Sequence, residues 1–486
     1  MCDSDDVMEI SVPMDTDNCE RYVDVIIVGA GLSGLTAAYH INKTDPGTSL
    51  CVLEANDRVG GRTLTVPLKT KNGTTDDFDL GGHWVGRSQT AIMELLDELG
   101  LETYTQRIDG TYLLQIGGDK ITSYSSDTPS LPFLSLLDLK MFNNKIEKFR
   151  KTIDPAHPYE CPNGEEWDKT SLETFLNQHL WTKAAKEYMR VIIRALSSME
   201  PSQQSVLSLM ASIAGSGGLE PMLEVTEDSA QGLKVKGGTQ QISKILVDKV
   251  GSDRVLLNQL VERIVQNDNK VIVSCRNGLK VTGRRLILAT PPAAVDKITF
   301  EPTLPVERRE INKRYNFGDY IKTIVTYGED FWTKKGLVGE VETSGGPSDV
   351  PGCDNGPITV TMDAMSHTGS PALVIFTAGK QARQWGQQQV DVRRNAVLQS
   401  LSTYFGKEAL SPLDYCEKDW SKEEYIGGAL ASLGTGAMQY FEEGIGGNFM
   451  RVHFAGRETA VEWDGNMCGA VETGKRTALE VLEVLQ

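Results

Sequence analysis

The chain lacks the features that mark membrane-spanning, secreted and nucleic-acid-binding proteins. Its 486 residues contain no uninterrupted apolar stretch of about 18 or more, so no transmembrane anchor is expected. The first residues are acidic and have no apolar core, which argues against a secretory signal, and residues 1–20 are predicted to be a disordered tail. Basic residues are scarce: 49 Lys and Arg face 66 Asp and Glu, and the net charge of −17 disfavours nucleic acids as partners.

Paired cysteines and clustered histidines are missing too. The 8 cysteines are scattered without C-x-x-C pairs, which is typical of reduced thiols in a cytoplasmic protein. The 6 histidines show no metal-ligand spacing, so no metal site is predicted. The length and the 40% apolar content fit a globular protein of two or three domains, compatible with a homodimer.

What the chain does have, near its N-terminus, is a strand, a glycine-rich turn, a helix and a second strand. We predict a buried strand over residues 23–28, a helix over 35–42 and a strand over 50–53 that ends at Glu54. This order is typical of a dinucleotide-binding unit, in which the helix N-terminus offers free N–H groups to phosphates.

The turn itself has the spacing that such a unit needs. Gly29 permits the tight turn, Gly31 allows the backbone to approach a pyrophosphate, and Gly34 allows the helix to pack close to the strand. Glu54 can accept hydrogen bonds from a ribose. A second glycine pair, bracketed by Arg58 and Arg62, follows this carboxylate and favours a flavin dinucleotide over an ordinary basic loop.

Later segments repeat the strand, glycine turn and helix pattern of a nucleotide-binding domain. Residues 451–456 are predicted as a strand ending in a glycine turn, and residues 467–485 as an amphipathic helix whose buried positions include Val471, Leu479 and Val481. We also expect strands at 255–265, 270–275, 286–288, 321–327 and 372–377, and helices at 90–99, 136–152, 171–180, 184–197, 205–213 and 390–405.

The predicted fold class is therefore α/β (α+β overall), with a Rossmann-like dinucleotide-binding domain and an inserted mixed α/β substrate domain. The first domain is expected to combine residues 21–90, 230–300 and 415–486. The substrate domain is expected to combine 91–229, read as mostly helical, with 301–414.

Five ordered motifs match a known family. Besides the N-terminal turn, they are Asp79-Leu-Gly-Gly-His-Trp84-Val-Gly86, residues 321–327 with Phe331-Trp332, Asp419-Trp420 with residues 425–428, and residues 454–459 with 463–467. On these residues the chain resembles flavin-dependent amine oxidases, most closely the monoamine oxidases, over residues 22–485.

The resemblance implies FAD and a set of residues that bind it. Val261 would contact the adenine through its backbone, Gly81 and Gly82 would pass close to the isoalloxazine ring, and Glu458 would reach the ribityl–pyrophosphate region. The full implied set is Gly29, Gly31, Gly34, Glu54, Arg62, Gly81, Gly82, His83, Trp84, Val261, Trp420, Glu458 and Met467.

Lys322 is the residue to which the resemblance gives a chemical role. The matching lysine of the family holds a water beside flavin N5 and supports reoxidation by O2, and a fixed cation there would stabilise developing negative charge. Periodicity alone leaves open a strand lysine that points to solvent. Trp420 would pack on the flavin side of the site, although a lone Trp is more often ordinary core.

Three positions depart from the family pattern. Covalent members attach FAD through a cysteine where this chain has Ala429, so noncovalent FAD is expected. The two rings that flank the flavin in the family are replaced by Leu430 and Asn466, which cannot present π faces to an amine nitrogen. These departures put arylalkyl monoamine oxidation in doubt and leave flavin binding untouched.

Three functions remain open from the sequence. The first is an FAD-dependent amine oxidase that converts a small-molecule amine to an imine, then an aldehyde, and reduces O2 to H2O2. The second keeps the flavin but oxidises another polar donor, a polyamine before an amino acid, with Asn466 and His83 as polar groups. The third is a noncatalytic FAD-binding regulatory protein, against which the retained Lys322 argues.

Overall fold

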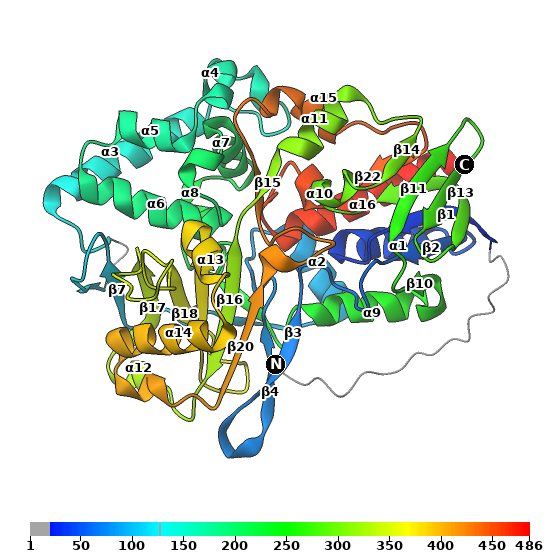
Figure 1. The fold of residues 1–486 in the computed structure, drawn as a ribbon. Helices are drawn as coiled ribbons and strands as arrows, with labels where there is room; N and C mark the ends of the chain where they lie inside the picture. Colours follow the sequence, from blue (N-terminus) through cyan, green and yellow to red (C-terminus); the bar gives the residue numbers. More distant parts are fainter. Residues whose placement is uncertain (1–19, 126–127) are drawn as a thin grey trace.

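The computed structural model describes residues 20–125 and 128–486. Residues 1–19 of the tail predicted at 1–20 lie outside them, and Glu20 begins the first strand. One mixed sheet forms the right side of the molecule in Figure 1. Its hydrogen-bonded order is β10-β2-β1-β13-β12-β11-β14, and β22 pairs with β13. The strands are β1 (Glu20–Val28), β2 (Leu50–Leu53), β10 (Val255–Leu256), β11 (Val261–Gln266), β12 (Val271–Cys275), β13 (Lys280–Leu288), β14 (Thr299–Glu301) and β22 (Val452–Phe454).

The central strands of this sheet are parallel and covered on both faces. β1 pairs in parallel with β2 and with β13, which is why residues 25–28 are a continuous buried run of Val and Ile. Helices cover one face, and the apolar residues of the other face form a second core with Val295 and Leu304. The covering helices are α1 (Leu32–Thr44), α2 (Thr90–Leu99), α9 (Gln240–Val250) and α16 (Met467–Leu485).

Helices from early and late in the chain meet in this half, where α1 and α16 lie side by side (Figure 1). Gly474 makes this close approach feasible, because a Cβ there would lie 2.3 Å from the carbonyl oxygen of Ser33. α16 has the predicted bounds, but Leu479 is 55% exposed, so its predicted burial is wrong. It lies off the stripe that buries Val471, Ala478 and Val481.

A second sheet forms the lower left of Figure 1, in the order β20-β16-β19-β18-β17-β7-β8. One of its faces packs on α12 and α14. The other faces the first half of the molecule and carries the residues discussed below. The elements are β7 (Thr111–Gln115), β8 (Thr122–Tyr124), β16 (Tyr320–Thr326), β17 (Leu337–Thr343), β18 (Val360–Asp363), β19 (Ala372–Ala378), β20 (Asp414–Asp419), α12 (Phe331–Lys334), α13 (Gly379–Trp385) and α14 (Val390–Phe405).

A helical block lies above this sheet and packs around its own core (Figure 1). Its members are α3 (Phe133–Arg150), α4 (Gly164–Lys169), α5 (Leu172–His179), α6 (Lys183–Ser197), α7 (Val206–Gly215), α8 (Leu219–Leu223), α11 (Val306–Arg314) and α15 (Phe441–Ile445). Shorter pieces complete the chain: α10 (Pro292–Val295), the hairpin of β3 (Thr65–Lys69) and β4 (Thr75–Asp79), the group of β5 (Trp84–Val85), β6 (Thr103–Thr105) and β9 (Leu233–Val235), and the pair of β15 (Tyr315–Phe317) and β21 (Ala431–Leu433).

Two parts of the predicted organisation differ from the structure. Residues 91–229 include the strands β6, β7 and β8 beside their helices. Residues 415–445, which we placed with the dinucleotide-binding domain, supply β20 to the second sheet and α15 to the helical block. The strands β6, β7 and β20 pair with partners distant in sequence, which local patterns do not encode.

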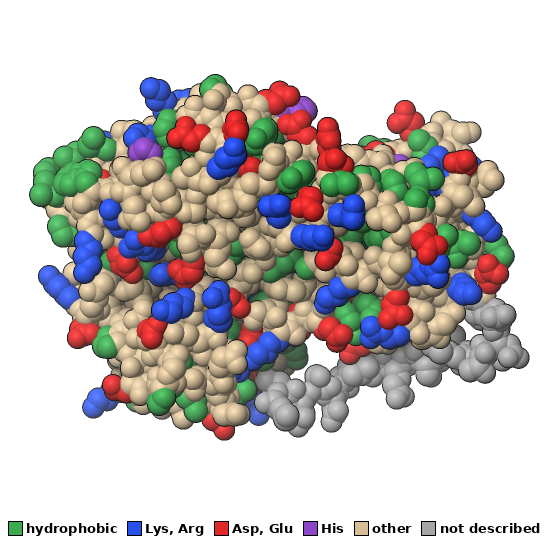
Figure 2. Space-filling model, turned by 45° about the horizontal axis from the view of Figure 1, so that its top comes forward, with side chains coloured by type: hydrophobic (Ala, Val, Ile, Leu, Met, Phe, Trp, Pro, Cys, Tyr) green, Lys and Arg blue, Asp and Glu red, His purple; other side chains and the backbone are tan. Residues whose placement is uncertain are grey.

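Charged side chains of both signs are interspersed over the face in Figure 2. The first turns of α3 carry four exposed apolar side chains, Phe133, Leu134, Leu137 and Met141. Among the described residues, no helix combines the length and apolar content needed to cross a membrane.

Candidate active site

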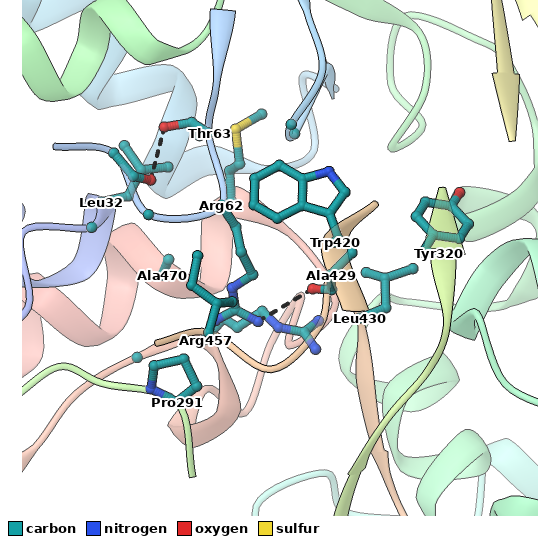
Figure 3. Close-up of a pocket in the computed structure, with 18 of the residues that line it drawn as sticks. Leu32, Arg62, Thr63, Pro291, Tyr320, Trp420, Ala429, Leu430, Arg457 and Ala470 are labelled. Carbon is teal, nitrogen blue, oxygen red and sulfur yellow. Dashed lines mark hydrogen bonds between the residues drawn. The ribbon is translucent and has the colours of Figure 1, made fainter. Parts of the chain in front are cut away.

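A cavity of about 460 Å³ lies between the two sheets. At one end it is bounded by the glycine turn after β1, and at the other by side chains of β16, β19, β18 and β17. Figure 3 shows part of its wall, with Trp420 at the centre and Tyr320 and Leu430 to its right. The cavity therefore joins the predicted nucleotide site to the predicted site of chemistry.

The glycine turn has one open position between two tight ones. A Cβ on Gly29 would lie 2.7 Å from the carbonyl oxygen of Ala289, and one on Gly34 would lie 2.0 Å from that of Gly29. A Cβ on Gly31 would have no atom within 4 Å, and Gly31 lines the cavity. Gly29 and Gly34 are therefore required by the fold itself, whereas Gly31 leaves room for a ligand against the backbone.

Glu54 lies on the cavity wall at the end of β2 and is 6% exposed. Its two oxygens accept hydrogen bonds from the Ala30 N–H at 2.7 Å and the Asn56 N–H at 2.9 Å. Each carboxylate oxygen has more than one acceptor site, so the group can still accept from a ribose hydroxyl. Val261, in β11, also lines the cavity.

Glu458 ties two arginines together behind the cavity wall. Arg62 donates to both of its oxygens, at 2.6 and 3.1 Å, and Arg457 donates at 3.0 Å. Burial alone would raise the pKa of Glu458, but the two guanidinium groups outweigh it and lower the pKa to about 2. Arg62 and Arg457 line the cavity, whereas Glu458 contacts both of them from behind its wall.

Lys322 lies on β16 and is 2% exposed, so the solvent-facing alternative is wrong. Its Nζ donates to the Gly81 carbonyl oxygen at 2.8 Å and lies 3.3 Å from Nδ1 of His83. It also lies 5.4 Å from the centre of the Trp84 ring. Gly81, His83 and Trp84 come from the same motif, so β16 and this motif together hold the amine on the cavity wall.

Burial shifts the pKa values of Lys322 and of the titratable groups around it. Burial lowers the pKa of Lys322 to about 7, against the attraction of Asp79 and with the help of Lys234. Burial likewise raises the pKa of Asp79 to about 6. His83 is held neutral, because burial and then Lys322 lower its pKa well below the usual range. The pKa of Lys322 therefore lies far below that of an exposed lysine, because burial outweighs the attraction of Asp79.

Trp420 is buried beside the cavity and donates from its indole nitrogen to the Leu80 carbonyl oxygen at 2.9 Å. This hydrogen bond fixes the ring against the segment that leads into Gly81. Ala429 and Leu430 follow on the cavity wall, and Arg62 donates to the Ala429 carbonyl oxygen at 3.4 Å (Figure 3).

The two positions of the expected aromatic pair come together, as predicted, on the same cavity. Leu430 lines it from the segment before β21, and Asn466 lines it from the N-cap of α16. Met467 follows Asn466, and its sulfur would lie 3.1 Å from a Cβ placed on Gly82. Neither wall position carries a ring.

Sequence reasoning missed six cavity residues on the second sheet: Tyr320, Glu340, Glu342, Val360, Met362 and Phe376. The rings of Tyr320 and Phe376 stack 5.3 Å apart. Alternation in Glu340-Val341-Glu342 was a usable signal, because residues at i and i+2 share a face of a strand. It would have been read as a solvent-exposed face, however, because two carboxyl groups rarely lie in a core.

These residues fit FAD. The open space at Gly31, the glycine pair after Arg58 and the carboxylate of Glu54 provide backbone and acceptor groups for a dinucleotide at one end. At the other end, Gly81, Gly82 and the buried amine of Lys322 face the same cavity.

Comparison with known proteins agrees with this geometry. The family model described as "Flavin containing amine oxidoreductase" matches residues 32–482. Amine oxidase [flavin-containing] A of Canis lupus familiaris is 33% identical over 95% of this chain and 85% of the relative. The probable flavin-containing monoamine oxidase A of Dictyostelium discoideum is 32% identical over 95% of this chain and 98% of the relative.

Two solved structures are similar along nearly their whole length. Cyclohexylamine oxidase from Brevibacterium oxydans IH-35A has a TM-score of 0.87 and 28% identity, covering 95% of this chain and 99% of the other. A wild-type putrescine oxidase bound to putrescine has the same TM-score and identity, covering 96% and 100%. With these matches and the cavity just described, the chain belongs to the flavin-containing amine oxidoreductases and is an FAD-dependent amine oxidase.

Proposed function

We propose that this oxidase binds FAD noncovalently and acts on aliphatic amines rather than on arylalkyl monoamines. The observation that carries the proposal is the wall formed by Ala429, Leu430 and Asn466 in the same cavity as Lys322. An alanine offers no thiol for attachment of a flavin. Leucine and asparagine offer no pair of rings for an aromatic substrate.

The residues that would hold FAD are those of the glycine turn, Glu54, Arg62, Val261 and the Gly81-Gly82 segment. When bound, FAD accepts two electrons from the amine and passes them to O2. The imine product then hydrolyses to an aldehyde and ammonia or a smaller amine.

The protein's own part is to position groups and manage protons. Lys322 is buried beside Gly81 and His83, so it can hold a water or a developing negative charge through its Nζ. Trp420 closes the wall beside it. The substrate nitrogen must be deprotonated to react, so the rate is expected to rise with pH near neutrality.

Names of relatives support an aliphatic substrate. Both similar solved structures are named for oxidases of non-aromatic amines, cyclohexylamine and putrescine. Asn466 and His83 supply polar groups at the flavin end that suit a substrate more polar than an arylalkylamine. A cytoplasmic location and a homodimer stay predictions.

The test begins with acid precipitation of the purified protein. A yellow supernatant and a colourless pellet are expected, and flavin retained in the pellet would contradict noncovalent binding. The protein is then mixed anaerobically with cyclohexylamine, putrescine, benzylamine and amino acids. Loss of flavin absorbance with the aliphatic amines, and its recovery in air, is expected. Reduction by benzylamine alone would overturn the substrate proposal.

A further inference from the structure

A single row of side chains crosses the second sheet beneath the cavity. In the strand pairing, Lys322 lies opposite Phe376, Phe376 opposite Val360, and Val360 opposite Glu342. Residues directly opposite one another in antiparallel strands point to the same face. All four line the cavity, so the row forms its floor from the buried amine to a buried carboxyl group.

The row has a defined length and a graded polarity. Four strands give three spacings, on the order of 14 Å between the first and last Cα atoms. The middle is apolar: Phe376 and Val360 form the floor, and Ile192 and Leu196 line the cavity from α6. A chain of methylene groups matches this middle, because burial there removes apolar surface from water.

The far end is acidic and has no basic partner. Glu342 is only 8% exposed and accepts hydrogen bonds from the hydroxyl groups of Tyr124, at 3.1 Å, and Tyr188, at 3.5 Å. Glu340 lines the same end of the cavity. Across the described ranges 20–125 and 128–486, no Lys, Arg or His forms an ion pair with either carboxyl group.

The pKa values of both carboxyl groups at this end are raised. Burial, and after it the neighbouring Glu342, raises the pKa of Glu340 to about 8. Burial also raises the pKa of Glu342 to about 7, against the two tyrosine hydroxyls. An incoming cation would favour the ionised form of both groups. One buried and one partly buried carboxyl group, with no ion-pair partner among the described residues, are thus suited to receive a cation from a ligand.

We propose that Glu342, assisted by Glu340, binds the distal ammonium group of an aliphatic diamine or polyamine whose other amine reacts beside Lys322. The apolar floor formed by Phe376 and Val360 carries the methylene chain between them. This inference rests on the proposed function and deepens it, because it assigns a substrate class to the same cavity. Glu342 is a specificity residue that touches substrate away from the reacting carbon.

The test compares two substrates of equal size on the FAD-loaded enzyme. Diaminooctane and nonylamine have the same number of non-hydrogen atoms and differ in one terminal group, an ammonium or a methyl. Anaerobic stopped-flow reduction gives an apparent Kd and a limiting rate for each. We expect the wild type to bind the diamine at least about tenfold more tightly, with similar limiting rates.

The decisive variant is Glu342→Gln, which keeps the shape and one acceptor oxygen for the tyrosine hydroxyls but removes the charge. Its apparent Kd for the diamine should rise at least about tenfold, while its Kd for nonylamine stays equal or falls. Glu342→Asp should recover part of the diamine affinity, and Glu340→Gln should show a smaller loss. Glu329→Gln, on an exposed loop outside this cavity, is the control for a lost surface charge.

The outcomes separate the two claims. Equal Kd values for both substrates in the wild type, unchanged in Glu342→Gln, would overturn the inference and leave amine oxidation intact. Reduction of wild-type flavin by neither substrate would overturn the proposed function and the inference with it. A parallel loss of affinity for both substrates in Glu342→Gln, with flavin content and Tm unchanged, would show a general packing role and also reject the inference.

Discussion

At the scale of single residues, the pKa values in the site depend on whether burial or neighbouring charges have the larger effect. Lys322 is buried, and the attraction of Asp79 does not offset the cost of burial, so its pKa falls to about 7. Glu458 is buried between two guanidinium groups, so attraction dominates and its pKa falls to about 2. Burial therefore leaves Lys322 with a pKa near neutrality, whereas Glu458 stays ionised because two guanidinium groups offset the cost of its burial.

The role proposed for Lys322 predicts the effect of Lys322→Met. Methionine keeps the length and apolar packing but removes the amine, so FAD binding should persist while reoxidation by O2 slows on the order of 100-fold. Stopped-flow mixing of the reduced protein with O2 measures this step. Lys234→Met, which removes the other buried lysine of this network, should slow it far less. An unchanged reoxidation rate in Lys322→Met would remove this residue from the chemistry.

Restoring two rings beside the flavin tests the meaning of Leu430 and Asn466. The double variant Leu430→Tyr/Asn466→Tyr should raise kcat/KM for benzylamine and phenethylamine roughly tenfold, about 1.4 kcal/mol, if the missing rings limit these substrates. Each single variant should gain less than the double one. No gain in a folded, FAD-loaded double variant would show that the rest of the cavity excludes aromatic amines.

The raised pKa of Glu342 predicts how stability depends on pH. An unfolded Glu titrates near about 4.3, whereas folded Glu342 keeps its proton up to about 7. The folded state thus binds more protons in this window, and the free energy of unfolding falls as the pH rises through it. Tyr124, Tyr188 and Glu340 are the titratable groups that face it, and none supplies a positive charge.

Glu342→Gln imitates the protonated carboxyl group, so its free energy of unfolding should not fall as the pH rises through this window. In the substrate-free protein it should be more stable than the wild type by on the order of 2 kcal/mol at pH 8, and equally stable near pH 4. Chemical denaturation at both pH values measures the difference. Glu483→Gln, on the exposed side of α16, should show no such pH-dependent gap. A constant gap at both pH values would mean that packing rather than ionisation sets it.

Single residues differed in how well the sequence predicted them. Gly31, Gly81, Lys322, Leu430 and Asn466 were identified because a motif gives each a fixed neighbour in sequence, and all five line the cavity. The acidic end was not, because Glu342 meets Tyr124 and Tyr188 only after distant segments have folded together.

At the scale of elements, the β1–α1 turn is the part most sensitive to a single carbon atom. Gly34→Ala would place a Cβ 2.0 Å from the Gly29 carbonyl oxygen, so α1 must move away from the strand. We expect a loss of about 3 kcal/mol and little bound FAD. Thermal unfolding and flavin content measure both effects.

Gly31→Ala is the matched variant in the same turn. Its Cβ would meet no atom within 4 Å, and its φ of −76° suits any residue. The apoprotein should therefore keep its Tm, while FAD affinity falls because the methyl group occupies the ligand's side of the turn. Equal FAD affinity in Gly31→Ala and the wild type would contradict a close backbone approach at this glycine.

Elements with a strong local pattern were predicted well. The helices α2, α14 and α16 and the strand β2 have the predicted bounds. The short strands β6, β7 and β8 were missed inside a segment read as helical, and β20 was placed with the wrong sheet. Strands of three to six residues depend on their partners more than on their own pattern.

At the scale of the whole molecule, the cavity lies between two sheets built from interleaved segments, so FAD would contact both halves at once. Binding to the folded state alone stabilises it by mass action, by about 2.7 kcal/mol when free FAD is 100 times its Kd. The Tm of the apoprotein should rise with FAD concentration. Arg62→Ala should weaken this rise, because Arg62 lines the cavity and is held there by Glu458. A Tm independent of FAD would contradict the binding site described above.

The sequence by itself determined the nucleotide-binding turn, the class of cofactor and several of the residues that line the cavity, Gly31, Gly81 and Lys322 among them. These depend on backbone conformation and on short motifs, which neighbouring residues specify directly. Only the tertiary structure decided that Lys322 titrates near neutral pH and that Glu342 faces it across an apolar floor. Burial and distance between groups on different strands arise when the chain folds, and no local pattern contains them.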